Sequence, residues 1–486
     1  MFYVPERVSA TSASRPCSTL MLTPPPPPSR RLLAAVLAAA VAALALPAAA
    51  AAADYVPGEV VVRYERSADR SARAEVQRET GVGGPEVFAP RTRVMKVRDG
   101  ESVAETLDEL RARPEVATAA PNPIARASAY VPPDPGNSGV PGGWQALQWN
   151  FMAETGVNAP DAWQRLIDVG RPGGSDVVVA VLDTGVAYSN RGRCPRSAGA
   201  SRRSVTCRRS PDFRAGDFVR GYDFVSDDAR PNDENGHGTH VAGTIGEGTG
   251  DDVAVTGLAY GARIMPVRVL DSLGEGDSVA ISAGIRWAAR NGADVVNLSF
   301  EFGTQVRRTE IPDILAALRY ARRRGALVVG ASGNAAARSI AYPARADEVL
   351  SVGATTQHGC VAEYSNNGPN LDLVAPGGGE DATIEGDPNC RPLEDPGGNI
   401  FQMTFVGSVR RFGLPTGYLG TSMAAPHVSA AAALVIASGV IGADPSPAAV
   451  ESRLKATARD LGPGGPDSRY GTGLLDAARA VGVGGF

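Results

Sequence analysis

The sequence predicts an α/β fold: a large domain with a mostly parallel sheet, preceded by a small α+β domain. In the C-terminal part of the chain, short continuous apolar runs alternate with helical stretches. This alternation is typical of parallel strands buried under helices on both faces. Nearer the N-terminus, strand-like runs and an amphipathic helix form a short segment of their own. The 57 glycines and 37 prolines favour a loop-rich molecule over a helical bundle.

Residues 1–53 are expected to be a signal peptide region. Arg30 and Arg31 precede an apolar run at 32–46, and an alanine-rich stretch follows up to Ala53. Positive charge, a short apolar core and small residues are typical of a secretory signal, and the run is short for a transmembrane anchor. We therefore expect cleavage near Ala53 and an extracellular protein with no membrane attachment afterwards.

Residues 54–128 are predicted to form the small α+β domain. The runs EVVVRYE at 59–65 and VMKV at 94–97 are strand-like, and SVAETLDELRA at 102–112 has the apolar period of an amphipathic helix. Residues 129–147, rich in proline and glycine, are expected to be a linker.

The large domain is expected over residues 148–486. Its strands are predicted from apolar runs, and one of its helices from the run DILAALRYARRRG. The predicted strands are 177–182, 294–300, 326–331 and 348–354, and the helix is 313–325.

Charge and cysteine content limit the partners and the compartment. The net charge of −4 gives no indication of a nucleic-acid partner. Cys17 lies in the signal region, and four cysteines in an exported chain suggest two disulfides with three possible connectivities. Proximity favours Cys194–Cys207 and Cys360–Cys390, whereas zinc lacks support because there is no CxxC pair and no nearby histidine.

The segment 191–209 is an arginine-rich insertion, which a Cys194–Cys207 bond would tether. It is either a basic surface for acidic partners or a solvated insertion of the kind that loops tolerate. Its arginines are Arg191, Arg193, Arg196, Arg202, Arg203, Arg208 and Arg209.

Four side chains of the types that a hydrolase needs follow predicted strands or begin predicted helices. Asp183 and Asn334 each follow a buried strand, His237 begins a glycine-flanked helix, and Ser422 begins a long apolar helix. Strand ends and the positive ends of helices are where open α/β sheets place their sites. A serine hydrolase needs four groups: a nucleophile, a base, a group that orients the base and an oxyanion donor.

These segments, VVVAVLDTGV, NGHGTHVAGTI, ASGN and GTSMAAPHVS, resemble the Asp, His, Asn and Ser motifs of the subtilisin-like serine peptidases. The order Asp, His, Ser matches this family and not the chymotrypsin or α/β-hydrolase orders. The resemblance implies a three-layer fold and a secreted, monomeric endopeptidase that cleaves proteins through an acyl-enzyme. It makes Ser422 the nucleophile, His237 the base, Asp183 the orienting group and Asn334 the oxyanion donor.

The resemblance covers nearly the whole chain, with a mature start at 148–163 and a final helix at 470–481. The alternative is an inactive subtilase-like binding protein, which would have no reason to keep all four residues. The small domain at 54–128 resembles a subtilase propeptide, an inhibitor and chaperone removed by autoprocessing between about Arg126 and Tyr130. An unrelated accessory domain is the alternative.

Substrates are expected to bind extended, by strand addition. The family commonly has glycine where Glu301 stands. The carboxylates of Glu275 and Glu301 either favour basic side chains or are solvated surface groups. The resemblance maps substrate contacts onto Leu273, Gly274, Glu275, Gly276, Ser299, Phe300 and Glu301, with Ala331, Ser332 and Gly333 flooring the primary pocket.

Calcium is the expected cofactor. The run GYDFVSDDARPNDENG resembles a calcium-binding loop of the thermitase branch, with Asp223, Asp228 and Asn232 as ligands. A second candidate site joins Asp212 to the loop 250–256. The alternative reading is an acidic, solvated loop.

Overall fold

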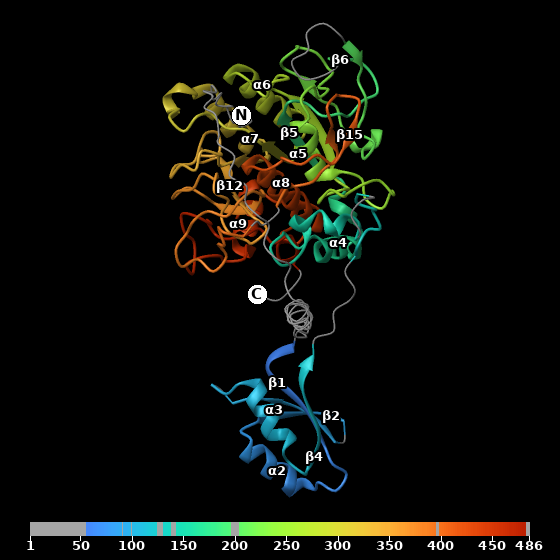
Figure 1. Cartoon of the computed structure of the whole chain (residues 1–486), viewed down its shortest axis with the longest axis vertical. Helices are drawn as coiled ribbons and strands as arrows, with labels where there is room; N and C mark the ends of the chain where they lie inside the picture. Colours follow the sequence, from blue (N-terminus) through green and yellow to red (C-terminus); the bar gives the residue numbers. More distant parts are fainter. Residues whose placement is uncertain are drawn as a thin grey trace, which may run out of the picture. The chain divides into compact units, whose positions relative to one another are not determined.

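The computed structural model divides into two compact units, with the boundary between residues 128 and 129 (Figure 1). The predicted signal region lies outside the described residues, and so do residues 124–129, which contain all of the expected maturation segment (Arg126 to Tyr130) except Tyr130. The structure describes residues 55–89, 91–98, 100–123, 130–137, 142–195, 204–394 and 398–482.

The N-terminal unit is the predicted α+β domain. Its four strands form an antiparallel sheet in the order β2-β3-β1-β4. Val60, Val62 and Tyr64 alternate along β1 and are fully buried, because successive side chains of a strand point to opposite faces. The elements are β1 (Tyr55–Tyr64), α2 (Arg70–Glu79), β2 (Gly83–Ala89), β3 (Thr92–Lys96), α3 (Val103–Arg111) and β4 (Val116–Pro123).

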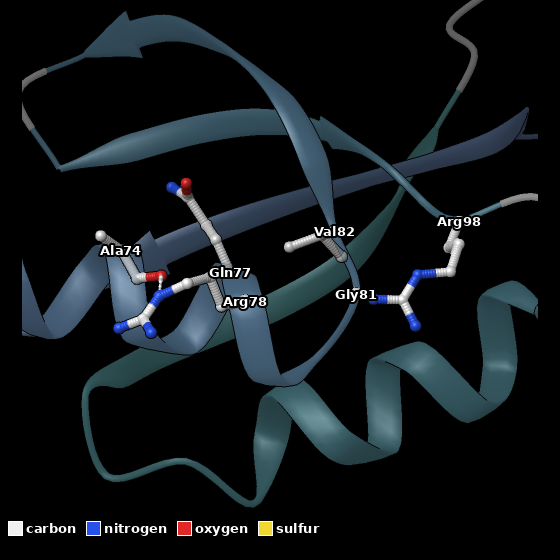
Figure 2. A pocket seen from close by; sticks show the side chains of 6 residues that line it. All are labelled: Ala74, Gln77, Arg78, Gly81, Val82 and Arg98. Carbon is white, nitrogen blue, oxygen red and sulfur yellow. Dashed lines mark hydrogen bonds between the residues drawn. The ribbon is translucent and has the colours of Figure 1, made fainter.

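A hollow of about 480 Å³ lies on this unit (Figure 2). Two arginines line it, and both are engaged locally: Arg78 donates to the carbonyl of Ala74, and Arg98 pairs with Glu101 at 3.2 Å. We assign no ligand to it.

The large unit is built on a seven-stranded sheet in which every neighbouring pair is parallel, in the order β13-β12-β11-β10-β5-β9-β8. Along β5, Val179 and Val181 enter one core while Ala180 and Leu182 enter the other. Both faces are therefore covered, which confirms the predicted three-layer α/β fold. The strands are β5 (Val178–Asp183), β8 (Tyr222–Asp223), β9 (Arg263–Arg268), β10 (Val295–Leu298), β11 (Leu327–Ala331), β12 (Val349–Thr355) and β13 (Leu373–Pro376).

Helix α8 (Thr421–Ser438) lies at the centre of this unit and packs against β10 to β13 (Figure 1). Among the described residues it is the one helix long and apolar enough to span a membrane, but 83% of it is buried in this core. Gly439 ends it in the left-handed conformation that favours glycine. The other helices are α4 (Ala159–Asp168), α5 (His237–Gly246), α6 (Ser278–Arg290), α7 (Pro312–Arg323), α9 (Pro447–Thr457) and α10 (Ala477–Ala480).

Two short hairpins and two disulfides complete the large unit. Both favoured pairings, Cys194–Cys207 and Cys360–Cys390, are present. The first bond joins β6 (Arg193–Pro195) to β7 (Ser204–Thr206) at the base of the arginine-rich insertion. The other hairpin pairs β14 (Thr404–Phe405) with β15 (Phe412–Gly413).

The described part of the expected linker packs onto the large unit. Trp144 is fully buried and contacts Trp163 with the ring centroids 5.5 Å apart. The carboxylate of Asp134 accepts hydrogen bonds from the backbone N–H groups of Gly250 and Asp251. The proline and glycine content predicted a linker and gave no indication of these contacts, which the side chains of Trp144 and Asp134 make.

The last helix is shorter than expected. Only Ala477–Ala480 is helical, because Gly471 and Gly473 take positive φ angles of 60° and 116° and turn the chain before it. Asp476 caps the helix by accepting from the backbone N–H of Arg479.

Candidate active site

The predicted catalytic residues lie at one edge of the sheet. Asp183 is the last residue of β5, and Ser299 and Ser332 directly follow β10 and β11. Since β5, β10 and β11 are parallel neighbours, their carboxyl ends meet at the edge where such sheets place their sites.

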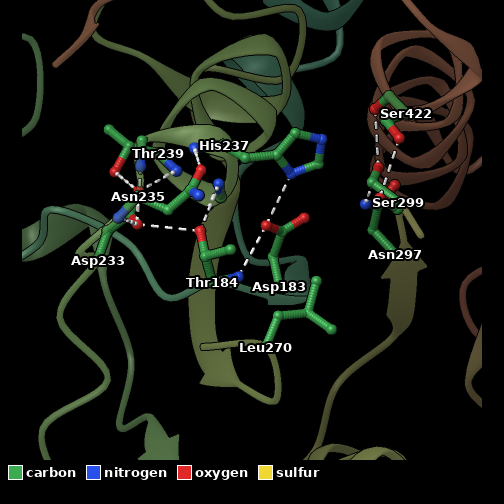
Figure 3. Close-up of polar contacts among 12 residues, drawn as sticks. Asp183, Thr184, Asp233, Asn235, His237, Thr239, Leu270, Asn297, Ser299 and Ser422 are labelled. Carbon is green, nitrogen blue, oxygen red and sulfur yellow. Dashed lines mark hydrogen bonds and ion pairs between the residues drawn. The ribbon is translucent and has the colours of Figure 1, made fainter. Parts of the chain in front are cut away.

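Asp183 and His237 form a hydrogen-bonded pair at this edge. The Nδ1 atom of His237 lies 2.8 Å from Oδ1 of Asp183, which is fully buried (Figure 3). The other carboxylate oxygen, Oδ2, has no hydrogen-bond partner in the described part of the chain. Burial alone would lower the pKa of His237, but the charge and the hydrogen bond of Asp183 outweigh it and raise this pKa.

A second buried carboxylate, that of Asp233, fixes the turn into α5. It accepts hydrogen bonds from the Thr184 hydroxyl at 2.9 Å and from the backbone N–H and hydroxyl of Thr239 at 3.0 and 2.6 Å. Sequence reasoning missed Asp233, although its place four residues before His237 was a signal. Gly238 permits the close approach of α5 to the segment that follows β5, since a Cβ there would lie 2.1 Å from the carbonyl oxygen of Gly185.

Ser422 lies in the first turn of α8 and is tied to the end of β10. Its hydroxyl donates to the carbonyl of Ser299 at 3.0 Å, and the Ser299 hydroxyl donates back to the carbonyl of Ser422 at 2.8 Å (Figure 3). Asn297 supports Ser299 by donating from Nδ2 to its hydroxyl at 2.9 Å. In this state the Ser422 hydroxyl is bonded to Ser299 and not to His237.

Asn334 faces the same helix start. Its Oδ1 accepts from the backbone N–H and the hydroxyl of Thr421, at 2.8 and 3.0 Å. Because a backbone N–H can only donate, this contact fixes which amide atom faces Thr421. The Nδ2 donor therefore points elsewhere, and it has no acceptor among the residues that the structure describes.

The expected substrate residues lie in three segments. Ser299, Phe300 and Glu301 follow β10, and Ala331, Ser332 and Gly333 end and follow the neighbouring strand β11. The segment 273–276 forms an exposed turn before α6, where the Asp271 carboxylate accepts from the backbone N–H groups of Leu273 and Glu275.

The first expected calcium site is partly occupied by protein contacts. Asp223 and Asp228 lie together, joined by backbone hydrogen bonds in both directions. The Asp223 carboxylate, however, pairs with Arg268 at 3.0 Å and accepts from two backbone N–H groups. Asn232 is buried, and its Oδ1 has no partner in the described chain.

The second candidate is an acidic cluster around Asp212. Both carboxylate oxygens of Asp212 are buried without a hydrogen-bond partner among the described residues. Burial, and then the charge of Asp251, raise the pKa of Asp212 to about 9. Glu247 is a buried neighbour whose pKa is also raised, first by burial and then by Asp212. The unpartnered oxygens of Asp212 could serve as cation ligands, whereas Asp251 pairs with Arg214 at 3.6 Å and Glu247 accepts from the backbone N–H of Met403.

The remaining histidines have structural contacts. Nε2 of His240 donates to the carbonyl of Ile400, and the ring stacks on Tyr418. Burial lowers the pKa of His240 to about 3. The ring of His427 contacts Phe151 edge-on, and burial lowers its pKa to about 4. His358 lies in a loop, 2.8 Å from Asp381.

Comparisons with known proteins agree with this arrangement. The model of the subtilase family matches residues 174–473, and that of the fervidolysin N-terminal prodomain matches residues 42–122. The chain is 32% identical over 388 residues to a thermophilic serine proteinase of Bacillus sp. (strain AK1), covering 79% of each chain. It is 35% identical over 339 residues to subtilisin Savinase of Lederbergia lenta, covering 69% of this chain and 99% of that one.

Among solved structures, a protease of Pseudoalteromonas arctica PAMC 21717 superposes with a TM-score of 0.52 at 30% identity, covering 69% of this chain and 96% of that chain. The parallel sheet, the histidine and serine at its edge and the separate N-terminal unit all accord with these matches. The chain thus belongs to the subtilase family: it is a subtilisin-like serine protease with an inhibitory propeptide.

Proposed function

We propose that this serine protease is a secreted endopeptidase in which Ser422 is the nucleophile, His237 the general base and Asp183 the group that orients the base. The observation that carries the proposal is the 2.8 Å bond between His237 and the buried Asp183, at the sheet edge where α8 presents Ser422. A buried carboxylate bonded to Nδ1 keeps the proton on that nitrogen, so that Nε2 is left to accept another.

The reaction begins when the Ser422 hydroxyl turns from the Ser299 carbonyl toward Nε2 of His237. His237 takes the proton as Oγ attacks the peptide carbonyl, and Asp183 stabilises the imidazolium that forms. His237 then returns the proton to the leaving amine, which leaves an acyl-enzyme on Ser422. Water, activated in the same way, hydrolyses this ester.

Asn334 is the proposed side-chain donor to the oxyanion. Its Oδ1 is held by Thr421, so Nδ2 is free to donate where negative charge develops. The backbone N–H of Ser422, in the first turn of α8, adds a second donor and the positive end of the helix dipole.

Calcium is proposed at the acidic cluster of Asp212, with Asp134 and Asp251 nearby. The unpartnered buried oxygens of Asp212 fit a hard cation, which prefers oxygen ligands. No three acidic, histidine or cysteine side chains converge as a metal cluster in the described ranges, so main-chain carbonyls would complete the shell. The ion would stabilise the loop and takes no part in catalysis. Calcium at Asp223, Asp228 and Asn232 stays a prediction, weakened by the Arg268 pair.

The remaining proposals concern the precursor. Residues 1–53 direct export, 54–128 inhibit the enzyme until they are cut off, and 148–486 act extracellularly as a monomer. Two disulfides in the large unit support an oxidising compartment.

Digestion of denatured casein tests the endopeptidase activity. The mature enzyme should release internal fragments, and a Ser422→Ala variant should release none. A folded wild-type protein that binds casein without cutting it would favour the alternative, a binding protein.

A further inference from the structure

A carboxylate that the proposed mechanism does not use lies at the same edge of the sheet. Glu301 follows β10, and its Oε1 accepts a hydrogen bond from the backbone N–H of Asn334 at 2.9 Å. Asn334 follows the neighbouring strand β11. The Glu301 side chain therefore crosses the gap between the ends of the two strands.

The other carboxylate oxygen covers Gly333. A Cβ built on Gly333 would lie 2.1 Å from Oε2 of Glu301, so the carboxylate sits directly against the glycine Cα. Gly333 also has φ of +107°, a conformation that favours glycine. Any side chain at position 333 would collide with the Glu301 carboxylate, so glycine is needed there for the carboxylate to lie in this position.

Glu301 is a partly buried carboxylate that has no cationic partner among the described residues. No ion pair of the described residues includes it, whereas buried Asp223 has Arg268. Burial raises the pKa of Glu301, and the N–H of Asn334 only partly opposes this. Burying a carboxylate without a counter-charge costs desolvation free energy. A positively charged group that binds beside it would offset this cost.

The proposed mechanism places a substrate residue next to this carboxylate. In the proposed mechanism the scissile carbonyl lies between Ser422 and the side chain of Asn334. The residue that owns this carbonyl is therefore adjacent to Asn334, whose own N–H is bonded to Glu301.

From these contacts we propose that Glu301 is a specificity-determining residue that selects a basic side chain, arginine or lysine, immediately before the scissile bond. The inference rests on the proposed function. The sequence offers a matching substrate, since Arg126 is the only lysine or arginine between Arg113 and Arg165 and lies in the expected maturation segment. The first cut of the precursor is then between Arg126 and Ala127.

The test uses the mature enzyme, prepared from the full precursor, and peptide p-nitroanilides that differ only in the last residue: Arg, Lys, Gln or Phe. Glu301→Gln removes the charge but keeps an amide oxygen that can accept from Asn334. We expect kcat/KM for the Arg and Lys peptides to fall about 10-fold to 100-fold, with the Gln and Phe peptides changed less than about threefold. The control Glu385→Gln, an exposed glutamate on a turn, should change none of them.

N-terminal sequencing of the matured wild-type chain gives a second readout, with Ala127 as the expected first residue before any further trimming. Equal kcat/KM for the Gln and Arg peptides in the wild type would overturn the proposal. So would an equal loss for all four peptides in Glu301→Gln, because it would mean that the carboxylate only supports Asn334. A wild-type protein that cleaves no peptide and whose serine does not react would instead contradict the proposed function.

Discussion

Replacing Asp183 with asparagine keeps the size of the side chain and removes its charge. The Nδ1 and Oδ1 atoms of the pair are 2.8 Å apart. Two opposite unit charges at this separation attract by about 6 kcal/mol at an effective dielectric of about 20. Each 1.36 kcal/mol or so is a factor of ten in rate, so losing this stabilisation of the imidazolium should lower kcat about 10⁴-fold.

The variant should also shift the pH dependence. Asp183 raises the pKa of His237, and catalysis needs the neutral imidazole, so activity falls as the pH drops through this pKa. Without the carboxylate the pKa falls, and the acidic limb of the pH profile for kcat/KM should move to lower pH. An asparagine N–H facing Nδ1 would also favour the wrong tautomer.

The assay is hydrolysis of one peptide p-nitroanilide from pH 4 to 9. Thermal unfolding and protein mass show that each variant is folded and intact. Asp176→Asn is the matched control, because Asp176 is an exposed aspartate in a surface pair with Arg171. The control should retain full activity. If Asp183→Asn is folded and keeps more than a tenth of the wild-type rate, the assignment of Asp183 is wrong.

Four further outcomes are expected. Ser422→Ala should accumulate an uncleaved precursor that retains 54–128, and efficient maturation of this variant in a protease-free host would contradict autoprocessing. Calcium at about 100 times its Kd should raise the Tm of the mature enzyme by about 5 °C or more, and Asp212→Asn should abolish this gain. Without calcium, the raised pKa of Asp212 means that its contribution to stability is full below pH 4 and is lost toward pH 9. Replacing Cys194 and Cys207 with serine removes a bond between residues 13 apart in the sequence. It should lower the free energy of unfolding by about 3 kcal/mol without abolishing catalysis. A folded but inactive variant would contradict this.

The sequence was enough to predict features that depend on local patterns. Continuous apolar runs at 177–182 and 326–331 located β5 and β11, because a strand buried on both faces needs no polar alternation. Glycine on both sides of His237 indicated the start of α5. Cysteines close in sequence were paired correctly, since a short loop limits the alternatives.

Contacts between distant segments could not be predicted in this way. Asp134 looked like part of a linker, and only folding brings it to the loop that contains Asp251. The reach of Glu301 to Asn334 depends on two strand ends being neighbours in the sheet. The pairing of Asp223 with Arg268 depends on β8 and β9 being adjacent, which the calcium-loop resemblance did not indicate.

The central claim is that Ser422 is a nucleophile activated by His237, and covalent labelling tests it most directly. A fluorophosphonate probe reacts with an activated serine and not with an ordinary helix-start hydroxyl. After labelling of the mature enzyme, peptide mass mapping should find the adduct on Ser422 alone, and His237→Ala should abolish it. A folded wild-type enzyme that remains unlabelled, or an adduct on another serine, would contradict the account.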